Sequence, residues 1–505
     1  MSVIRCRIAP SPTGPLHIGT ARTALFNYLF ARRESGTFIL RLEDTDVARS
    51  TLEFERDILE GLHWLGIAWD EGPEVAGQPA RGPYGPYRQM QRLERYSAAA
   101  ERLLSADRAY YCYCTPEELA ADRKAQEAAR QPPHYVGRCA RLTADERRAR
   151  EAEGRKAVIR FRVGEGLVAF DDVIRGHVEI DTTALGGDLV IIRSDGTPLY
   201  HFSVVVDDVE MEITHVIRGE DHLSNTPKHI LLFRALGAVV PVFAHLPLIL
   251  NPDRTKMSKR KTQTAVADYR AQGFLPEALV NYFALLGWSS GTEEEIFSLD
   301  ELAARFDLSR VQSAGAVFDR ERLEWLNGQW IRRLSPEEVA ERALPYLAER
   351  LDRLRADGAA VRQPTVDDLF SLMPVVQERL PTLAAAADML DFVFIEEIAA
   401  DPALLVPKRW DAATTRDALL TARGVIADVG RVSYEADELE PPLRALAEER
   451  GWKVGDLFMA IRVAVTGRTA TPPLFDTLVA VGYERTLARL ERAAGILQGV
   501  AESPA

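Results

Sequence analysis

The chain has 505 residues, of which 47% are hydrophobic and 27% are charged, and its formal net charge at pH 7 is −13. This length allows three or more domains, and the acidic balance argues against a general nucleic-acid binder without excluding a local basic surface. The sequence lacks an apolar run of membrane-spanning length and a signal-peptide pattern, and its four cysteines are too few for a disulfide framework. We therefore expect a cytoplasmic protein without a membrane partner.

A strand, a turn and a helix are predicted at the start of the chain. Residues 3–8 form an apolar run that is typical of a buried strand. After the turn, apolar residues recur at the spacing of one helix face: Leu25, Phe26, Leu29 and Phe30. Gly36 is expected to end this helix, and residues 37–42 predict a second strand. This β–turn–α–β unit brings the turn to a helix N-terminus.

The turn has the sequence Pro10-Ser11-Pro12-Thr13-Gly14-Pro15-Leu16-His17-Ile18-Gly19-Thr20. A helix N-terminus offers unpaired N–H groups and a partial positive charge, and both favour phosphate. Gly19 would let a phosphate or a base approach the backbone, and His17 would supply a donor beside it. The alternative is that His17 only caps the helix or lies on the surface.

Three carboxylates, Glu43, Asp44 and Asp46, follow the second predicted strand. Open α/β sheets bind ligands at the carboxyl ends of such strands, so this cluster is a candidate binding site. The alternative is a helix start, because acidic residues favour a first helical turn. Residues 76–89 are rich in glycine and proline and predict a loop that ends this lobe.

Residues 87–199 are predicted to form an insertion of mixed helices and strands. Thr115 and Thr143 each begin a capping box, which indicates a helix start. Residues 158–163 and 188–192 have the pattern of strands. Three of the four cysteines lie in this stretch: Cys112, Cys114 and Cys139. Thiolates at such spacing can bind tetrahedral zinc, and the alternative is three buried, inert cysteines.

Further strands are predicted downstream. Residues 198–208 form a continuous apolar run that suits a strand buried on both faces, and residues 214–222 predict the next strand and its exit loop. A helix beginning at Asn225 and a strand over residues 242–250 follow. Arg7 and Arg218 lie at or near the ends of predicted central strands. Arginine suits a carboxylate clamp, so both are candidates for one, although either could form an ordinary ion pair.

The last predicted strand leads into a basic loop with the sequence Asn251-Pro252-Asp253-Arg254-Thr255-Lys256-Met257-Ser258-Lys259-Arg260-Lys261. Its alternative interpretation is a solvated basic surface, the usual meaning of a charge run. From Ser335 onward the spacing predicts helices only, in two small domains without an internal repeat. Helix breaks are expected at Pro374, Pro381, Pro402, Pro407, Pro441, Pro442, Pro472 and Pro473.

The histidine-containing turn and the basic loop together resemble the paired signatures of class I aminoacyl-tRNA synthetases. Thr20 stands where a second histidine is frequent in that class, and His-Ile-Gly-Thr after Pro-Ser-Pro-Thr-Gly is similar to bacterial glutamyl-tRNA synthetases. The resemblance implies an α/β fold with a Rossmann-like parallel-sheet catalytic domain, an α+β insertion and an all-α anticodon-binding region. The implied segments are the two halves of the catalytic domain (1–86 and 200–236), an acceptor-binding insertion (87–199), a domain with the basic loop and tRNA stem contacts (237–334) and two helical anticodon-binding domains (335–395 and 396–505).

Site residues follow from the same resemblance. Those implied to bind ATP are Thr13, His17, Gly19, Asp221, Lys256, Ser258 and Lys259, and the implied catalytic residues among them are His17, Lys256 and Lys259. Those implied to bind glutamate are Arg7, Ala9, Ser11, Glu43, Tyr200 and Arg218. Those implied to meet the anticodon are Arg379, Thr471, Pro472 and Leu474. Arg379 also fits an ordinary surface arginine.

The resemblance further implies a structural zinc site formed by Cys112, Cys114, Cys139 and the phenolate of Tyr135. Arg141 stands where some relatives have a histidine ligand, and His134 is a nearby substitute. A glutamate-binding asparagine of one relative is Val204 here, so that contact is absent or replaced.

The implied activity is ligation of L-glutamate to tRNA(Glu) with ATP and Mg²⁺, by a monomer. A truncated relative that glutamylates a modified tRNA base lacks the helical C-terminal region, and a nucleotidyltransferase would not need it. A glutamine-specific enzyme fits Arg7 less well, and a non-catalytic RNA-binding relative should have lost His17 or Lys259. Whether tRNA(Gln) is also charged stays open.

Overall fold

The computed structural model describes residues 3–75, 77–257 and 264–502. The chain divides into two compact units, Met1–Tyr269 with Pro276–Arg320, and Arg270–Leu275 with Glu321–Ala505. Among the described residues, no helix combines the length and the apolar content that crossing a membrane would need.

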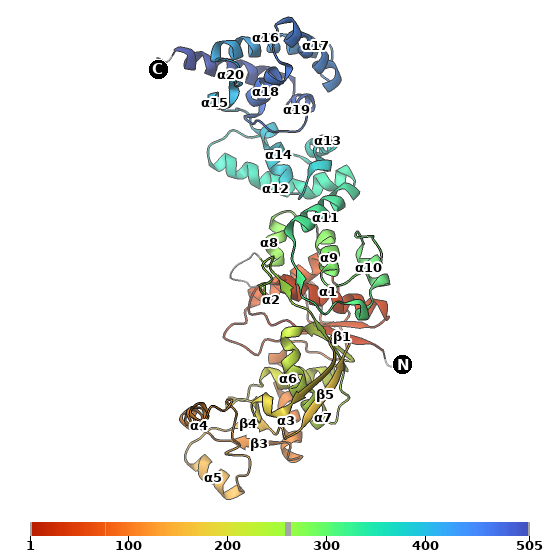
Figure 1. Cartoon of the computed structure of the whole chain (residues 1–505), viewed down its shortest axis with the longest axis vertical. Coiled ribbons are helices and arrows are strands. Elements are labelled where there is room, and N and C mark those ends of the chain that lie inside the picture. The colour runs from red at the N-terminus through yellow and green to blue at the C-terminus, as the bar shows by residue number, and fades with distance from the viewer. Residues whose placement is uncertain (1–2, 76, 258–263, 503–505) are drawn as a thin grey trace. The chain divides into compact units, whose positions relative to one another are not determined.

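The first unit is built on a six-stranded sheet with the order β2-β1-β8-β9-β5-β6 (Figure 1). Its strands are β1 (Arg5–Ile8), β2 (Thr37–Leu40), β5 (Leu167–Asp172), β6 (Gly176–Asp181), β8 (His215–Gly219) and β9 (Val242–Leu246). Neighbouring strands pair in parallel, except β5 with β6. The predicted parallel-sheet fold is therefore confirmed. The sheet is wider than expected, because β5 and β6 come from the stretch that was predicted to be an insertion.

Two helices lie on opposite sides of β1 in Figure 1, α1 (Ile18–Arg33) and α6 (Tyr200–Glu210). Arg7 of β1 pairs with Asp208 of α6. Because side chains alternate along a strand, Cys6 and Ile8 point to the other side, where α1 packs. The turn before α1 therefore lies at the carboxyl end of β1, beside the sheet's ligand-binding edge.

The predicted strand over residues 198–208 is wrong, since this stretch forms helix α6. All seven residues from Phe202 to Asp208 are buried, so this part of the helix is covered all round and has no solvent-exposed stripe. A short apolar run of this kind has the same pattern in a buried strand and in a buried helix, and periodicity alone cannot separate them.

The prediction that Gly36 ends the first helix also needs correction. Helix α1 stops at Arg33, and the residue with a left-handed backbone is Ser35, with φ 51°. Gly36 lies where β2 approaches the chain before β1, and a Cβ there would come within 2.4 Å of the Ile4 carbonyl oxygen. Close backbone approach, rather than a helix cap, requires glycine at this position.

A separate three-stranded antiparallel sheet with the order β3-β4-β7 lies within the predicted insertion. Its strands are β3 (Ala109–Cys112), β4 (Val158–Phe161) and β7 (Leu189–Ile192), and helices α3 (Leu93–Ser105), α4 (Pro116–Ala128) and α5 (Ala144–Ala152) accompany them. Both capping boxes are confirmed: Thr115 and Thr143 each accept from the N3 backbone, and the N3 glutamate reaches back.

The rest of the first unit consists of shorter elements. They are α2 (Leu52–Trp64), α7 (Thr226–Ala235), β10 (Ile249–Leu250), α8 (Val266–Ala271), α9 (Pro276–Leu285), α10 (Leu299–Arg305) and β11 (Ala316–Val317), and α11 (Arg320–Arg333) follows. The predicted strand over residues 242–250 is in fact two strands, β9 and β10. The second of them pairs in parallel with β11.

The second unit is helical, as predicted from Ser335 onward. Its helices are α12 (Pro336–Ala356), α13 (Val366–Val376), α14 (Ala385–Phe394), α15 (Pro402–Leu405), α16 (Ala412–Gly430), α17 (Ala436–Glu449), α18 (Val454–Thr466), α19 (Leu474–Val481) and α20 (Tyr483–Glu502). Pro374 lies inside α13, and Pro441 and Pro442 lie inside α17, so the breaks predicted there are wrong. Burial of Leu439, Leu443 and Leu446 on one face of α17 offsets the backbone hydrogen bonds that the two prolines remove.

Candidate functional site

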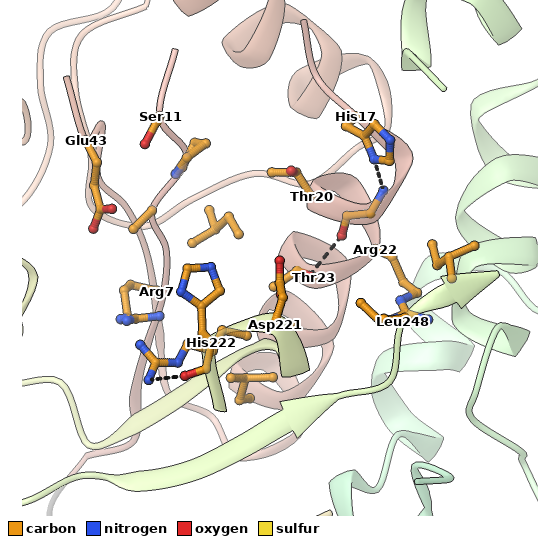
Figure 2. Close-up of a pocket in the computed structure, with 18 of the residues that line it drawn as sticks. Arg7, Ser11, His17, Thr20, Arg22, Thr23, Glu43, Asp221, His222 and Leu248 are labelled. Atoms are coloured by element: carbon orange, nitrogen blue, oxygen red, sulfur yellow. Dashed lines mark hydrogen bonds between the residues drawn. The ribbon is translucent and has the colours of Figure 1, made fainter. Parts of the chain in front are cut away.

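A cavity of about 480 Å³ lies at the carboxyl ends of β1 and β8 and at the start of α1. It is lined by all six residues implied to bind glutamate: Arg7, Ala9, Ser11, Glu43, Tyr200 and Arg218. Four residues implied to bind ATP also line it: His17, Gly19, Asp221 and Lys256. Thr13 is not among the described residues that line this cavity, and Ser258 and Lys259 lie outside the described residues. Figure 2 shows Ser11, Glu43 and Arg7 on one side of the cavity and His17 on the other.

His17 is both the N-cap of α1 and a wall of the cavity. Its Nδ1 accepts a hydrogen bond from the Gly19 N–H at 2.9 Å, so the ring proton of the neutral imidazole is on Nε2. His17 therefore caps the helix, as the alternative interpretation expected, and it also lines the cavity. The first turn of α1 carries no acidic residue, which leaves the positive end of the helix dipole uncompensated by its own helix.

Lys256 and Asp221 also line the cavity and contact each other, with Lys256 Nζ 3.7 Å from Asp221 Oδ2. Both side chains are about half exposed, so this ion pair can open at little cost when an anion enters. The site thus places a helix N-terminus and a lysine where a phosphate chain would need them.

The two candidate arginines differ in their partners. Arg7 is bound bidentately by Asp208, with Nε 3.0 Å from Oδ1 and Nη2 3.1 Å from Oδ2. Arg218 donates to His245 Nε2 (3.2 Å), His229 Nδ1 (3.1 Å), Thr226 Oγ1 (2.8 Å) and the His222 carbonyl (3.4 Å). Among the described residues, none of the partners of Arg218 is a carboxylate. Burial lowers the pKa of Arg218, which marks it as a desolvated cation.

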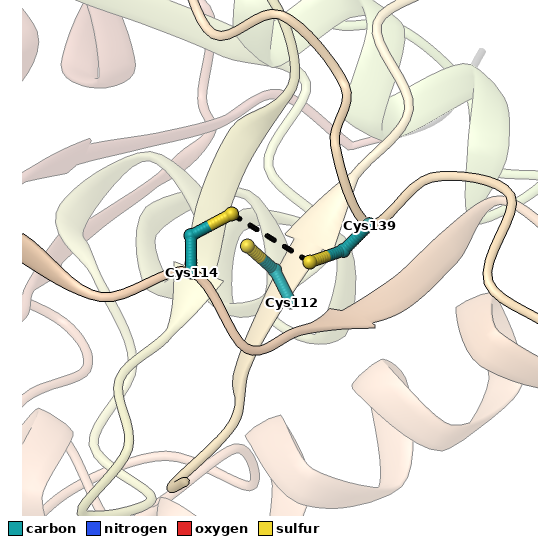
Figure 3. Close-up of side chains that lie close together, drawn as sticks. All are labelled: Cys112, Cys114 and Cys139. Atoms are coloured by element: carbon teal, nitrogen blue, oxygen red, sulfur yellow. Dashed lines mark hydrogen bonds between the residues drawn. The ribbon is translucent and has the colours of Figure 1, made fainter. Parts of the chain in front are cut away.

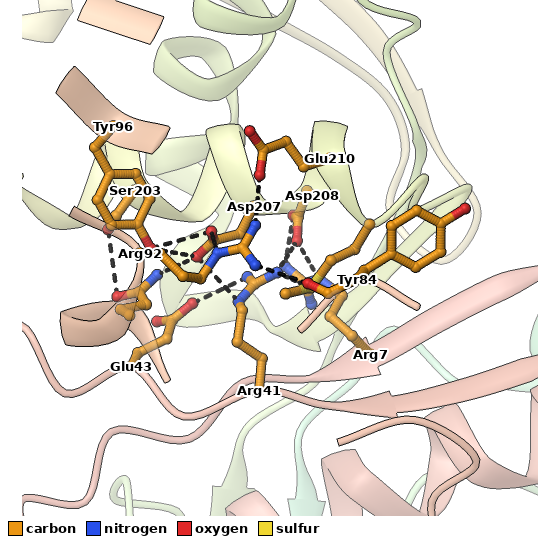
Figure 4. A network of polar contacts seen from close by, with 12 residues as sticks. Arg7, Arg41, Glu43, Tyr84, Arg92, Tyr96, Ser203, Asp207, Asp208 and Glu210 are labelled. Atoms are coloured by element: carbon orange, nitrogen blue, oxygen red, sulfur yellow. Dashed lines mark hydrogen bonds and ion pairs between the residues drawn. The ribbon is translucent and has the colours of Figure 1, made fainter. Parts of the chain in front are cut away.

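A buried ionic network supports the part of the cavity that contains Arg7 and Glu43 (Figure 4). Arg41 contacts Asp208 at 2.8 Å, Asp207 at 3.5 Å and Glu43 at 3.2 Å, and Arg92 contacts Asp207 at 2.6 Å. Burial acts to raise the pKa of Asp208, but the charges of Arg7 and Arg41 more than offset it and lower this pKa. Sequence reasoning missed Arg41, Arg92, Asp207 and Asp208. For Arg41, Asp207 and Asp208 the available signal was charged residues within or next to apolar runs, and Arg92 carried no such signal.

Glu43 lies between this network and the cavity. Burial raises its pKa to about 7, although Arg41 and Arg7 act to lower it. Tyr200 also lines the cavity, and its hydroxyl lies 3.0 Å from His222 Nδ1. Burial raises the pKa of Tyr200 to about 12. This part of the cavity therefore combines a carboxyl group that titrates near neutral pH with a neutral phenol.

The three cysteines of the predicted zinc site lie together (Figure 3). The sulfur atoms of Cys112, Cys114 and Cys139 are all within 4.8 Å of one another. The Tyr135 hydroxyl lies 3.4 Å from Cys112 Sγ and 3.6 Å from Cys114 Sγ. Arg160 lies against this group, with Nε 3.3 Å from Cys112 Sγ, and a cation there favours thiolates. Three thiols and a phenol fit the donor set of a tetrahedral zinc ion.

His134, the substitute ligand, is exposed, and its Nδ1 contacts the Pro132 carbonyl at 3.1 Å. It is not part of the cysteine group among the described residues.

The predicted anticodon residues lie in the second unit. Arg379 is exposed in a short 3-10 turn after α13, and Nη1 donates to the Val375 carbonyl. Thr471 is half-buried and accepts from Arg462, whereas Pro472 and Leu474 are buried. Arg379 is thus the one of the four whose side chain is exposed.

Comparison with known proteins agrees with this geometry. Residues 3–325 match the family described as tRNA synthetases class I (E and Q), catalytic domain, and residues 338–494 match an anticodon binding domain. A glutamate–tRNA ligase of Symbiobacterium thermophilum is 47% identical over 96% of this chain and 99% of its own, and one of Heliobacterium modesticaldum is 46% identical over 99% and 98%. A crystal structure of a glutamate tRNA ligase from Elizabethkingia meningosepticum superposes with a TM-score of 0.84 at 33% identity, over 98% of this chain and 99% of that chain. The chain therefore belongs to the glutamate–tRNA ligase family of class I tRNA synthetases.

Proposed function

We propose that this chain activates L-glutamate with ATP and transfers the glutamyl group to the 3′ end of tRNA(Glu). The observation that carries the proposal is one cavity that joins the N-terminus of α1 to Arg218, a buried cation without a carboxylate partner among the described residues. The helix end suits the phosphates of ATP, and the arginine suits a carboxylate of the amino acid.

In the first step, an oxygen of the glutamate α-carboxylate attacks the α-phosphorus of ATP, the bond to the β-phosphate breaks, and pyrophosphate leaves. In the second step, a hydroxyl of the terminal tRNA ribose attacks the acyl carbon, and AMP leaves. Neither step needs a covalent enzyme nucleophile, so catalysis consists of positioning and of stabilising charge on phosphate oxygens. Mg²⁺ bound with ATP would neutralise part of that charge.

The chain's own residues divide this work. His17 Nε2–H and the N-terminus of α1 bind the phosphates from one side, and Lys256 binds them from the other. Lys259 and Ser258 of the basic loop are proposed to join Lys256, and Asp221 releases Lys256 when ATP enters. Thr13 would act from the turn before α1.

The other end of the cavity is proposed to bind glutamate through its ammonium group and a carboxylate. The Glu43 carboxylate and Ser11 would bind the ammonium group, and Arg218, with Tyr200, would bind a carboxylate. Because Arg7 is already neutralised by Asp208, Arg218 contributes the larger share of the attraction. Glutamine lacks the second carboxylate, so this site would bind it less tightly.

Two further features are proposed to serve tRNA binding. The group of Cys112, Cys114, Cys139 and Tyr135 would hold a structural zinc ion that orders the segment next to the three-stranded sheet. Arg379 would read an anticodon base, because sequence-specific RNA recognition targets splayed single-stranded bases.

The chain would act as a monomer, and a solution mass near the chain mass of 56.2 kDa tests this.

The test of the proposal is charging of transcripts of tRNA(Glu) and tRNA(Gln) with radiolabelled glutamate. Charging of tRNA(Glu) alone supports the activity and a discriminating role of Arg379. Charging of both supports the activity and removes that role. Charging of neither by a folded, ATP-binding protein overturns the proposal.

A further inference from the structure

Asp172, His245 and Arg218 come from three neighbouring strands, β5, β9 and β8, and form a buried chain of hydrogen bonds. His245 Nδ1 lies 2.6 Å from Asp172 Oδ2, and both side chains are 0% exposed. On the other side of the ring, His245 Nε2 lies 3.2 Å from Arg218 Nε and 3.0 Å from Thr226 Oγ1. The Phe243 ring stacks on the imidazole and lies 5.6 Å from the guanidinium, so the ring plane of His245 is fixed by packing.

The chemistry of the end groups determines the tautomer of His245. An ionised carboxylate only accepts, so the proton of the neutral ring is on Nδ1 and is donated to Asp172. A guanidinium only donates, so Nε2 contacts Arg218 favourably only through its lone pair, and the Thr226 hydroxyl, which can donate as well as accept, is compatible with that state. Burial lowers the pKa of His245, and the His245 hydrogen bond and backbone N–H groups keep Asp172 ionised against the effect of its burial. The neutral ring with its proton on Nδ1 satisfies both neighbours at once.

His229 and Thr226 complete the support of the guanidinium. His229 Nδ1 accepts from Arg218 Nη1 at 3.1 Å, and Thr226 Oγ1 accepts from Nη2 at 2.8 Å. With the His222 carbonyl, these contacts engage four of the five N–H groups of Arg218. The fifth, on Nη1, has no partner within the described part of the chain. Neutral acceptors therefore fix the guanidinium without cancelling its charge, in contrast to the carboxylate on Arg7.

We infer that Asp172 and His245 are positioning residues that fix Arg218 for a carboxylate of the amino-acid substrate by holding the His245 ring in its Nδ1–H tautomer. The inference rests on the proposed function, because it takes glutamate as the ligand of Arg218. Direct contact between Asp172 and Arg218 would neutralise the cation. With the His245 imidazole between them, the Asp172 carboxylate orients the ring, the ring orients the guanidinium, and the positive charge of Arg218 is left for the substrate.

Three variants separate this role from simple structural support. In His245→Gln, the longer amide reaches the position of Nε2 and can present its oxygen to Arg218. In His245→Asn, the shorter amide reaches only the position of Nδ1, so the contact with Asp172 is kept and that with Arg218 is lost. In Asp172→Asn, the amide N–H₂ can donate to Nδ1, which moves the ring proton to Nε2, where it opposes the Arg218 N–H.

The readout is steady-state aminoacylation of tRNA(Glu) by the full chain, with glutamate and ATP varied separately. His245→Asn and Asp172→Asn should raise KM for glutamate by about tenfold to about a hundredfold and change KM for ATP by less than about twofold. His245→Gln should stay within about threefold of the unmodified chain in both. His177→Asn is the matched control, since His177 also pairs with an aspartate of β5 but is exposed on β6, and it should change neither constant.

Equal losses in His245→Gln and His245→Asn, or a parallel rise of KM for ATP, would overturn the inference. If a variant does not fold, the nitrogen-15 shifts of the histidine rings in the unmodified chain decide the matter. They should show a neutral His245 protonated on Nδ1, and protonation on Nε2 would contradict the inference. Absence of glutamate charging by the unmodified chain would instead count against the proposed function.

Discussion

Arg7 and Asp208 form a bidentate ion pair across 201 positions of sequence, with N–O distances of 3.0 and 3.1 Å. The pair joins β1 to α6, and Arg41 contacts the same aspartate at 2.8 Å. The part of the cavity that contains Arg7 therefore rests on buried charges that neutralise one another. Removing Asp208 would take away the carboxylate that binds Arg7 and one of the three that contact Arg41, and an uncompensated buried charge is costly.

Asp208→Asn should therefore destabilise the chain. The variant leaves Arg7 and Arg41 facing a neutral amide, and the expected loss is about 3–5 kcal/mol in the free energy of unfolding of the first unit. Urea-induced unfolding followed by circular dichroism measures it. Asp46→Asn removes the partner of Arg49 in an exposed pair and should have little effect. Similar losses in both variants would show that burial of the network does not matter.

His17→Asn should separate helix capping from catalysis. Asparagine is a good N-cap, so the thermal stability of the chain should be kept. The donor at Nε2 is lost, so kcat for aminoacylation should fall by about 10² to about 10³-fold. His17→Ala should lose the same activity and also some stability. A variant His17→Asn with the activity of the unmodified chain would reduce His17 to a cap.

Glu43 should make glutamate use depend on pH near neutrality. Its pKa is raised by burial from 4.5 to about 7, so the free enzyme gains the carboxylate that the substrate ammonium needs only as pH rises toward 7. His222, with a pKa of about 4, and Tyr200, with a pKa of about 12, titrate outside this range. We expect kcat/KM for glutamate to rise between about pH 5 and about pH 8 and then to level off.

The control for this profile is Glu43→Gln, which should have a lower kcat/KM for glutamate without the rise. An identical profile in the variant would assign the rise to another group. The sign for stability is opposite to that for activity. Between pH 4.5 and about pH 7 the folded chain keeps a proton that the unfolded chain has released, so this one group lowers the free energy of unfolding as pH rises.

Zinc should bind at the three-cysteine group and stabilise the segment around it. Metal analysis of the purified chain should find about one zinc ion, and chelation should lower the first unfolding temperature. Cys114→Ser and Tyr135→Phe should each weaken retention of zinc during dialysis. Cys6→Ala is the matched control, because Cys6 is buried in β1, away from this group, and its loss should leave the zinc content unchanged. Equal zinc content in all three variants would exclude the proposed ligands.

Local signals predicted a large part of the fold. The capping boxes at Thr115 and Thr143 each mark a helix start in the structure, because a cap depends on residues only three apart. The stretch of α6 was predicted to be a strand, because a continuous apolar run has no periodicity that separates a buried strand from a buried helix. A helix break was predicted at Pro441 and Pro442, but burial of one face of α17 outweighs the tendency of proline to end a helix.

The site was predictable where a motif marks it and not where it depends on distant pairs. His17, Gly19 and Lys256 come from two motifs and line one cavity. Arg41 and Asp208 are 167 positions apart, and Asp172 and His245 are 73 apart, with no local pattern that links them. Strand order decides which of these charges meet and neutralise each other. No local pattern in the sequence encodes that order.

The most direct test of the account is a comparison of glutamate and glutamine as substrates for charging tRNA(Glu), in the unmodified chain and in Arg218→Gln. The unmodified chain should charge glutamate and reject glutamine, and the variant should lose about 10² to about 10³-fold in kcat/KM for glutamate. A variant that charges glutamate as well as the unmodified chain would contradict the central role of Arg218 in binding the substrate carboxylate.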